Sequence, residues 1–211
     1  MKKLILIVSL FVGVLGARSA TITFNVDALD LLSGGSGSAP MSLDGLVILV
    51  ASTSDSIFTG PSPTAFASGD DVVLFRGNSY GSGIQGYFSA SIVIDPANFS
   101  GLGSGDPLQL FWFPTLTTNS VTPGSSTVYG QFRKDTADPP GGDGSAAWYF
   151  TSAGDTLALT MVTQSEGGST PDSAGYASHV VPEPSHYAVG LFAVGLCVHR
   201  VIRLRRQRSV A

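Results

Sequence analysis

Polar and apolar side chains alternate without interruption in residues 21–26, which read TITFNV. Successive side chains of an extended chain point to opposite faces, so Ile22, Phe24 and Val26 share one face and the polar residues share the other. Residues 156–162, TLALTMV, repeat the pattern with two leucines and a methionine. Both stretches therefore predict β-strands that bury one face.

The remaining sequence between residues 21 and 164 consists of similar short runs, separated by breaks rich in Gly, Ser, Pro and Asp. Such spacing is typical of an all-β sandwich or barrel. Residues 46–50, LVILV, are continuously apolar and predict a central strand. The predicted strands are residues 21–26, 46–51, 71–76, 86–94, 108–113, 127–133, 146–151 and 156–163. We expect an all-β fold, an antiparallel β-sandwich of jelly-roll-like or Ig-like type.

Aromatic residues in these strands are expected in the core, because they bury the largest apolar area. The core candidates are Phe24, Phe75, Phe88, Phe111, Phe113, Phe132, Trp148 and Phe150. Aromatic rings that are exposed instead could stack on sugar rings. The residues considered for sugar stacking are Trp112, Trp148, Tyr80, Tyr87, Tyr129 and Tyr149.

Charge is distributed unevenly along the 211-residue chain. All 15 acidic residues lie between Asp27 and Glu183, where only Arg76, Arg133 and Lys134 are basic, so this region carries −12 while the whole chain carries −4. The other Lys and Arg residues lie at the two ends. Nucleic-acid binding depends on clustered Lys and Arg that displace counterions, so we expect no nucleic-acid partner.

Residues 1–19 have the composition of a secretory signal peptide. Two lysines precede an apolar run over residues 4–15, and Ala17 and Ser19 supply the small residues that signal peptidase requires before a cut at Ala20. The run is shorter than the roughly 20 residues of a membrane-spanning helix, which favours a cleaved signal helix over a retained anchor. We expect the region that follows to be exported.

Three signals follow one another at the C-terminus. The first signal is a Pro-Glu-Pro motif, formed by Pro182, Glu183 and Pro184. It predicts a stiff, extended stalk, because each proline restrains the residue before it. An apolar stretch then predicts a membrane helix, and its arginine-rich continuation predicts a cytoplasmic tail by the positive-inside rule. The helix includes Tyr187, Leu191, Phe192, Val194, Leu196 and Val198, and the tail includes Arg200, Arg203, Arg205, Arg206 and Arg208.

This order of motif, helix and basic tail, over residues 182–208, resembles the PEP-CTERM sorting signal of exported bacterial proteins. The resemblance implies processing near the Pro-Glu-Pro motif by a membrane-embedded exosortase. It also implies transient anchoring in the inner membrane, in a bacterium that makes extracellular polysaccharide or biofilm matrix. The alternative is an ordinary C-terminal membrane anchor with a chance Pro-Glu-Pro sequence.

Four parts of the chain follow from these signals. Residues 1–19 are the predicted signal peptide, residues 20–165 the extracellular β-sandwich, residues 166–181 a flexible linker, and residues 182–208 the sorting signal. The linker is predicted from its Gly, Ser and Pro content. Each boundary coincides with a change in composition.

Residue types that many hydrolases and zinc sites need are missing from the predicted domain. The sole cysteine, Cys197, lies in the predicted membrane helix, and His179, His186 and His199 lie in the linker or the sorting signal. A domain without a thiol or an imidazole has no Ser-His-Asp triad, Cys-His pair or zinc cluster. We therefore expect no enzymatic activity and no cofactor.

Carboxylates are the chemical groups left to consider. A pair of them can hydrolyse a glycosidic bond, and the candidates are Asp70, Asp71, Asp95 and Asp155. Aspartates beside Gly, Pro or Ser usually form turns, so a structural role is expected for these. One predicted loop has a composition suited to Ca²⁺ but lacks EF-hand spacing, so a turn is expected there too. Its acidic residues are Asp135, Asp138 and Asp143.

These features together predict a non-enzymatic cell-surface or extracellular-matrix protein associated with exopolysaccharide or biofilm. Its expected partners are signal peptidase, an exosortase, the membrane and an extracellular polysaccharide. Two alternatives stay open. One is a carbohydrate-binding module with a row of exposed aromatic rings, and the other is a carbohydrate-active enzyme that uses two aspartates, either with an ordinary membrane anchor.

Overall fold

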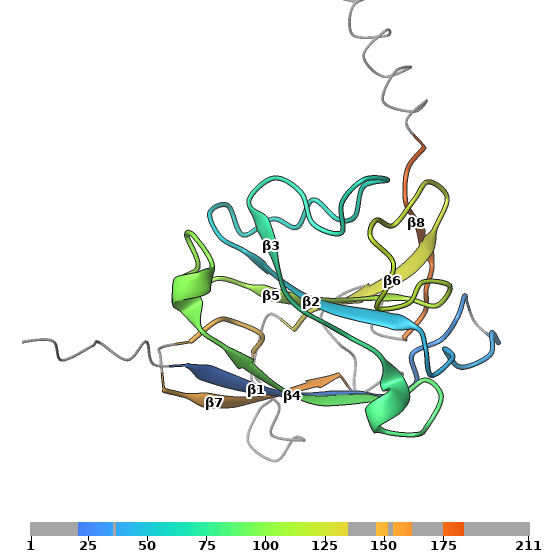
Figure 1. The fold of residues 1–211 in the computed structure, drawn as a ribbon, viewed down its shortest axis with the longest axis horizontal. Helices are drawn as coiled ribbons and strands as arrows, with labels where there is room; N and C mark the ends of the chain where they lie inside the picture. The colour runs from blue at the N-terminus through green and yellow to red at the C-terminus, as the bar shows by residue number, and fades with distance from the viewer. Residues whose placement is uncertain (1–20, 36, 135–146, 152–153, 162–174, 184–211) are drawn as a thin grey trace, which may run out of the picture.

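The computed structural model describes residues 21–35, 37–134, 147–151, 154–161 and 175–183. Within these residues the chain forms eight β-strands in two sheets and two short 3₁₀ helices (Figure 1). The all-β prediction is confirmed for this part of the chain. The predicted signal peptide, Pro184, the membrane helix, the basic tail and the loop with Asp135, Asp138 and Asp143 lie outside the described residues.

The smaller sheet has three strands in the order β4-β1-β7 and forms the lower layer in Figure 1. Its strands are β1 (Ile22–Ala28), β4 (Phe88–Ile94) and β7 (Thr156–Met161). β1 pairs with β4 in the antiparallel direction and with β7 in the parallel direction. The prediction of a purely antiparallel sandwich is therefore wrong at this pair. Parallel pairing arises because β7 enters the sheet beside the start of β1, where the Gly154 N–H donates to the Thr21 carbonyl at 3.0 Å.

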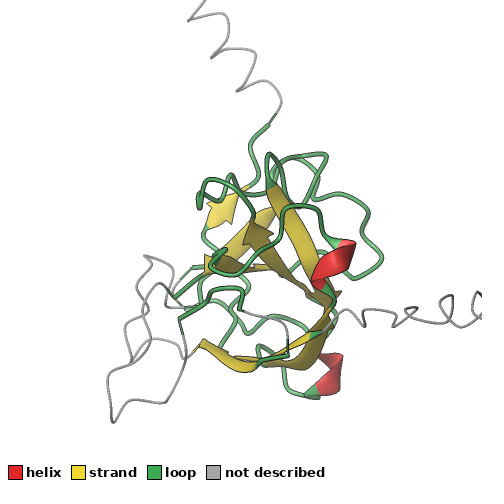
Figure 2. Cartoon of the chain, turned by 90° about the vertical axis from the view of Figure 1, so that its left-hand side faces the viewer, coloured by secondary structure: helices red, strands yellow, loops and turns green. Residues whose placement is uncertain are grey.

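The larger sheet has five strands in the order β3-β2-β5-β6-β8, and Figure 2 shows the two layers turned by 90°. Its strands are β2 (Leu46–Ser52), β3 (Asp71–Gly77), β5 (Leu108–Phe113), β6 (Val128–Phe132) and β8 (His179–Val180). All four neighbouring pairs are antiparallel. β2 is buried along its whole length, as its continuously apolar sequence predicts.

The inner faces of the two sheets form the main core. Phe24 and Ile92 from the smaller sheet belong to the same buried cluster as Leu49 and Trp112 from the larger sheet. Seven of the eight aromatic residues predicted for the core are at most 2% exposed, and the eighth, Phe75, is partly buried. The prediction of the core aromatics is thus confirmed, because large aromatic side chains bury the most apolar area.

A second apolar cluster covers the outer face of the larger sheet. It combines Phe111, Phe113 and Tyr129 from the strands with Phe66 from the loop between β2 and β3. The Phe66 ring meets the Phe113 ring edge-on, with centroids 5.3 Å apart. This cluster explains why β2 lacks alternation, since its residues supply two cores in turn. The inner cluster takes Val47, Leu49 and Ala51, and the outer cluster takes Leu46, Ile48 and Val50.

The strand predicted at residues 146–151 is not formed in the described residues 147–151. Trp148 and Phe150 are buried as in a strand, and the backbone makes an isolated bridge between Pro107 and Tyr149. The Leu108 N–H donates to the Trp148 carbonyl at 2.8 Å, and the Phe150 N–H donates to the Asp106 carbonyl at 2.7 Å. Pro107 and Tyr149 face each other between these two hydrogen bonds, so the contact is a single bridge rather than a strand.

The flexible linker predicted at residues 166–181 is wrong for its last part, because residues 175–181 pack on the domain. The Ala177 N–H donates to the Gly34 carbonyl at 3.1 Å, and β8 then pairs with the edge of β6. His179 stacks on Tyr129 with ring centroids 5.2 Å apart, so the folded domain does contain an imidazole. Burial of Ala177 and Val181, together with the new hydrogen bonds, offsets the entropy lost on ordering this segment.

Candidate functional site: a polar pocket beside the outer core

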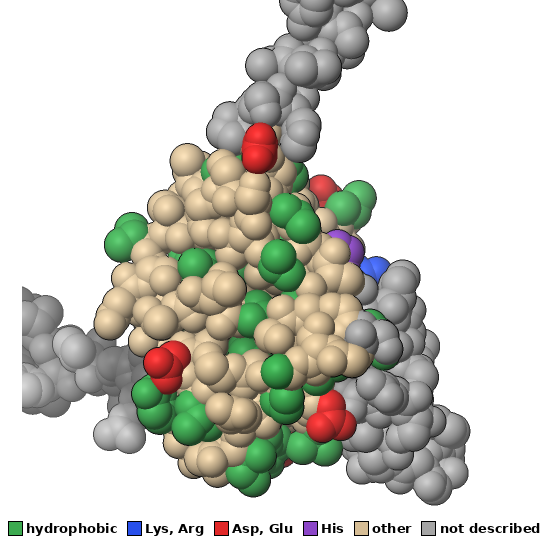
Figure 3. Space-filling model, turned by 90° about the vertical axis from the view of Figure 1, so that its right-hand side faces the viewer, with side chains coloured by type: hydrophobic (Ala, Val, Ile, Leu, Met, Phe, Trp, Pro, Cys, Tyr) green, Lys and Arg blue, Asp and Glu red, His purple; other side chains and the backbone are tan. Residues whose placement is uncertain are grey.

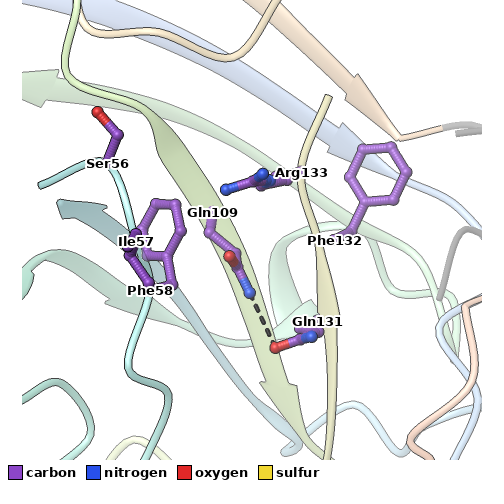
Figure 4. Close-up of a pocket in the computed structure, with 7 residues that line it drawn as sticks. All are labelled: Ser56, Ile57, Phe58, Gln109, Gln131, Phe132 and Arg133. Carbon is purple, nitrogen blue, oxygen red and sulfur yellow. Dashed lines mark hydrogen bonds between the residues drawn. The ribbon is translucent and has the colours of Figure 1, made fainter. Parts of the chain in front are cut away.

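A pocket of about 330 Å³ opens on the outer side of the larger sheet, where β5 begins and β6 ends (Figure 4). One wall comes from the loop after β2 and the floor from the two strands. The lining residues are Ser56, Ile57, Phe58, Gln109, Gln131, Phe132 and Arg133. Sequence analysis selected none of these residues as part of a site.

Strand pairing explains why polar residues meet here. Phe111 is paired with Gln131, and Leu110 with Phe132, so Gln109 and Arg133 directly follow the last pair of the register, where β6 ends. Alternation then keeps the two glutamines and Arg133 on the outer face of the sheet. The outer face is therefore apolar over most of β5 and becomes polar at its start.

Two glutamines form the floor of the pocket. Gln109 is only 5% exposed, and its Nε2 donates to Gln131 Oε1 at 2.9 Å (Figure 4). A carboxamide carries two N–H donors and an oxygen with two acceptor sites, so this single bond leaves further donors and acceptors on the pair. The buried position of Gln109 holds the pair in one orientation. The floor can therefore offer hydrogen bonds in a defined direction.

An apolar and cationic rim surrounds the amides. The Arg133 guanidinium lies 5.9 Å from the centroid of the Phe58 ring, and Ile57 is 65% exposed. In Figure 4 the side chain of Arg133 extends toward Gln109 while the ring of Phe132 points to the other side of its strand. The pocket thus combines an aromatic ring, a guanidinium and two amides, which is the composition of a site for a polar organic ligand.

The loop that forms the pocket wall is held by Asp70, just before β3. Its Oδ2 accepts hydrogen bonds from the Ser54 N–H at 2.7 Å and from the Asp55 N–H at 3.3 Å. Hydrogen bonds from Ser54, through its hydroxyl and its backbone N–H, lower the pKa of Asp70 to about 2. The carboxylate is therefore ionised at neutral pH and fixes the first part of the loop.

Asp71 holds the other end of the same loop from a buried position. It is 8% exposed, and its Oδ2 accepts from the Thr59 N–H at 2.9 Å, while its Oδ1 has no hydrogen-bond partner among the described residues. Burial, with a smaller effect of the nearby charges of Asp70 and Asp55, raises the pKa of Asp71 to about 6. Opposite pKa shifts in neighbouring carboxyls also occur in acid–base catalysts, but the bonds to backbone N–H groups favour a structural role here.

The four aspartates considered for glycoside hydrolysis are not brought together. Asp70 and Asp71 lie at the start of β3 in the larger sheet, whereas Asp95 and Asp155 lie on either side of the start of β1 in the smaller sheet. Asp95 accepts a hydrogen bond from the Ala97 N–H at 2.9 Å and caps a 3₁₀ helix. Its role as a turn residue agrees with the structural alternative.

The aromatic residues considered for sugar stacking do not form an exposed row. Trp112, Trp148 and Tyr129 are buried, and Trp112 Nε1 donates to the Leu32 carbonyl at 3.2 Å. Tyr87 and Tyr149 are half-buried, and Tyr80, at 60% exposed, is the exposed member of the set. The buried members of the set serve the core, and the pocket is lined by two other aromatic residues, Phe58 and Phe132.

The described part of the chain offers neither a metal-ligand cluster nor a membrane-spanning helix. It contains no group of three or more His, Cys, Asp or Glu residues placed to hold a metal ion. Its helical segments are the two single 3₁₀ turns, Ser79–Gly81 and Pro96–Asn98, and none of its helices is long and apolar enough to cross a bilayer.

The described part of the chain ends at Glu183, within the predicted sorting motif. Val181 is fully buried in the outer cluster, Pro182 is half-buried, and Glu183 is exposed and accepts a hydrogen bond from the Ser126 hydroxyl at 2.9 Å. The Ser126 N–H also donates to the Val181 carbonyl at 3.0 Å. The motif therefore begins directly at the surface of the folded domain.

No family model, curated protein or solved structure shows significant similarity to this chain.

Proposed function

We propose that this chain is an exported bacterial cell-surface or matrix protein, sorted by an exosortase through a PEP-CTERM signal at residues 182–208. The observation that carries the proposal is the ordered set of signals at the two ends of the chain. A signal peptide precedes an acidic domain, and a Pro-Glu-Pro motif, an apolar stretch and an arginine-rich tail follow it. The domain itself is proposed to be a non-catalytic sandwich of jelly-roll-like or Ig-like type, displayed toward extracellular polysaccharide.

The surface of the domain supports export. Figure 3 shows a face with few charged side chains, on which hydrophobic side chains are scattered and acidic side chains are more frequent than basic ones. An acidic surface keeps copies of a secreted domain apart and soluble. It also disfavours adhesion to anionic lipid headgroups, so membrane attachment would depend on the C-terminal helix.

The end of the domain supports processing of the motif. Because Val181 is buried and Glu183 is exposed, the chain leaves the sandwich at Pro182. Proline at this position cannot donate a hydrogen bond to continue β8, so the strand stops before the motif. The exposed Glu183 at the surface of the domain therefore supports access of a membrane-embedded enzyme to this segment.

The test replaces Pro182, Glu183 and Pro184 with alanine in a host that has an exosortase. We expect loss of C-terminal processing, seen as a larger mature mass, and retention of the protein in the inner-membrane fraction. The control replaces Ser185 and His186, which adjoin the motif, and should be processed normally. An unchanged mass and location in the motif variant would show that the C-terminus is an ordinary membrane anchor.

A carbohydrate-binding module is the second candidate function, and the pocket at Gln109 and Gln131 favours it over an aspartate-based enzyme. A module needs directed hydrogen bonds and an apolar surface, which the pocket supplies. An enzyme needs two carboxyl groups across a cleft, and among the described residues no carboxylate lines this pocket.

A further inference from the structure

We infer that the pocket between β5, β6 and residues 56–58 binds a uronate unit, that is, a sugar ring carrying a carboxylate, of an extracellular polysaccharide. The inference rests on the proposed function in one respect, since export brings the domain to the place where such polymers occur. The binding chemistry is independent of the sorting signal. It follows from the amides, the apolar wall, the guanidinium and the volume.

The amide pair supplies hydrogen bonds for ring hydroxyls. Gln109 donates to Gln131, which leaves the Gln131 NH₂ group and the Gln109 carbonyl oxygen with capacity for a ligand. A hydroxyl can accept from the first and donate to the second. Neighbouring hydroxyls of a sugar offer this combination, whereas an apolar ligand would leave the amides unpaired at a cost.

The wall supplies an apolar surface for the C–H face of the ring. Ile57 is exposed although it is large and hydrophobic, and Phe58 lies beside it. The wall is held in place before any ligand arrives, because the Ile57 N–H donates to Asp55 Oδ1 at 2.8 Å, Asp70 binds the N–H groups of residues 54 and 55, and Asp71 binds the Thr59 N–H. Preorganisation of this kind reduces the entropy lost on binding.

The guanidinium selects an acidic sugar. Arg133 is one of only three basic residues between Asp27 and Glu183, and it lines the pocket. Another of them, Arg76, lies over the Phe66 ring at 4.6 Å and donates to the Ser120 carbonyl, outside the pocket. A planar guanidinium binds a carboxylate through two parallel hydrogen bonds. A basic group at the pocket of an otherwise acidic domain therefore favours an anionic ligand.

The volume limits the size of the bound unit. The pocket of about 330 Å³ lies at the lower end of the range for small-molecule sites, roughly 300 to 1,000 Å³. This space suits a single sugar ring with its substituents. The neighbouring units of a polymer would extend over the exposed surface beside Ile57.

The experiment titrates the full-length protein in detergent with a galacturonate trisaccharide and with its methyl ester, a neutral probe of the same ring and length. We expect binding of the acid form and a loss of affinity of roughly 10- to 100-fold for the ester, which lacks the charge-assisted bond. Arg133→Gln should lose a similar factor, and the matched control Arg76→Gln should bind as the wild type does. Near-ultraviolet circular dichroism checks that each variant is folded.

A second pair of variants avoids any effect on folding. Ile57→Asp adds a negative charge to the pocket wall, and Ile84→Asp makes the same change at an exposed isoleucine elsewhere, since the two side chains are 65% and 60% exposed. Only the first should weaken binding. Absence of binding, or binding that neither Ile57→Asp nor Arg133→Gln weakens, would overturn the site, and equal affinity for acid and ester would overturn the uronate assignment. Alanine replacement of residues 182–184 should leave this titration unchanged, so a failure of sorting and a failure of binding are distinguishable.

Discussion

The indole ring of Trp112 on β5 lies directly against the backbone of Gly130 on β6, its paired residue across the sheet. A Cβ atom at position 130 would overlap Cζ2 and Cε2 of the indole. Trp112 is fully buried in the inner core, so the ring has no free space to move into. Glycine usually weakens a strand, but at position 130 the missing side chain leaves room for the Trp112 ring to lie over β6.

Gly130→Ala should therefore destabilise the domain by about 1 to 3 kcal/mol or more, through overpacking against a ring that cannot retreat. Urea unfolding followed by tryptophan fluorescence measures the free energy of unfolding. The control is Gly103→Ala, where nothing lies within 4 Å of the added methyl group. Equal stabilities of the two variants would contradict the packing of Trp112 on Gly130.

Because of Asp71, the free energy of unfolding should decrease as the pH rises from about 4 to about 6. Burial raises its pKa from the ordinary value of 3.8 to about 6, so the folded state binds more protons than the unfolded state in this window. Where the folded state binds more protons, the free energy of unfolding decreases with pH. Asp70 has the opposite sign: its lowered pKa contributes stability above pH 4 that is lost as the pH falls toward 2.

Asp71→Asn removes the buried charge and should stabilise the protein by roughly 1 to 2 kcal/mol at pH 7.5, with little effect at pH 4. Asp70→Asn is the matched control and should be destabilising at pH 7.5, since it loses an ionised acceptor of backbone N–H groups. Urea unfolding at the two pH values measures both variants. A lower stability of Asp71→Asn at pH 7.5 would show that the charge of Asp71 is compensated.

Neighbouring valines test whether the segment before the Pro-Glu-Pro sequence belongs to the folded domain. Val181 is 0% exposed and Val180 is 54% exposed. Val181→Ala should cost about 1 to 3 kcal/mol of the free energy of unfolding because it leaves a cavity in the outer cluster. Val180→Ala should cost less than about 0.5 kcal/mol. Similar small effects at both positions would mean that residues 175–181 behave as a linker after all.

The two pocket glutamines should be energetically coupled. Gln131→Leu leaves the buried Gln109 amide without its partner and should cost about 1 to 3 kcal/mol in the free energy of unfolding. Combining it with Gln109→Leu should cost less than the sum of the two single changes, because two leucines leave no unpaired polar group. Strictly additive effects in the double-mutant cycle would indicate that the hydrogen bond contributes nothing to stability.

Strand positions could be predicted from local patterns, whereas the pocket could not. Gln131 and Arg133 show the period of two that is expected of one strand face, but Gln109 lies 22 residues away from its partner. Register across β5 and β6 brings them together, and register is a non-local property. The wall residue Phe58 resembles any aromatic residue in a loop until Asp70 and Asp71 are seen to hold that loop. A glutamine and an arginine at alternate positions were the one signal available beforehand.

Residues 175–181 are a second case in which the local sequence pattern did not predict the structure. Its composition resembles a linker, yet Ala177 and Val181 are buried and β8 completes the edge of the larger sheet. A strand of two residues carries too little pattern to be recognised, and its formation depends on an unpaired edge at β6 that no nearby residue reveals.

Local chemistry was sufficient to identify the all-β class, the buried aromatic residues and the apolar and basic character of the two ends, because alternation, hydropathy and charge act within a few neighbouring residues. Tertiary structure alone revealed the parallel pairing of β1 with β7, the second core on the outer face and the pocket of Gln109, Gln131 and Arg133. These features depend on which distant strands become neighbours. That choice is made by the free energy of burying both faces of the larger sheet at once, which no single segment of the chain contains.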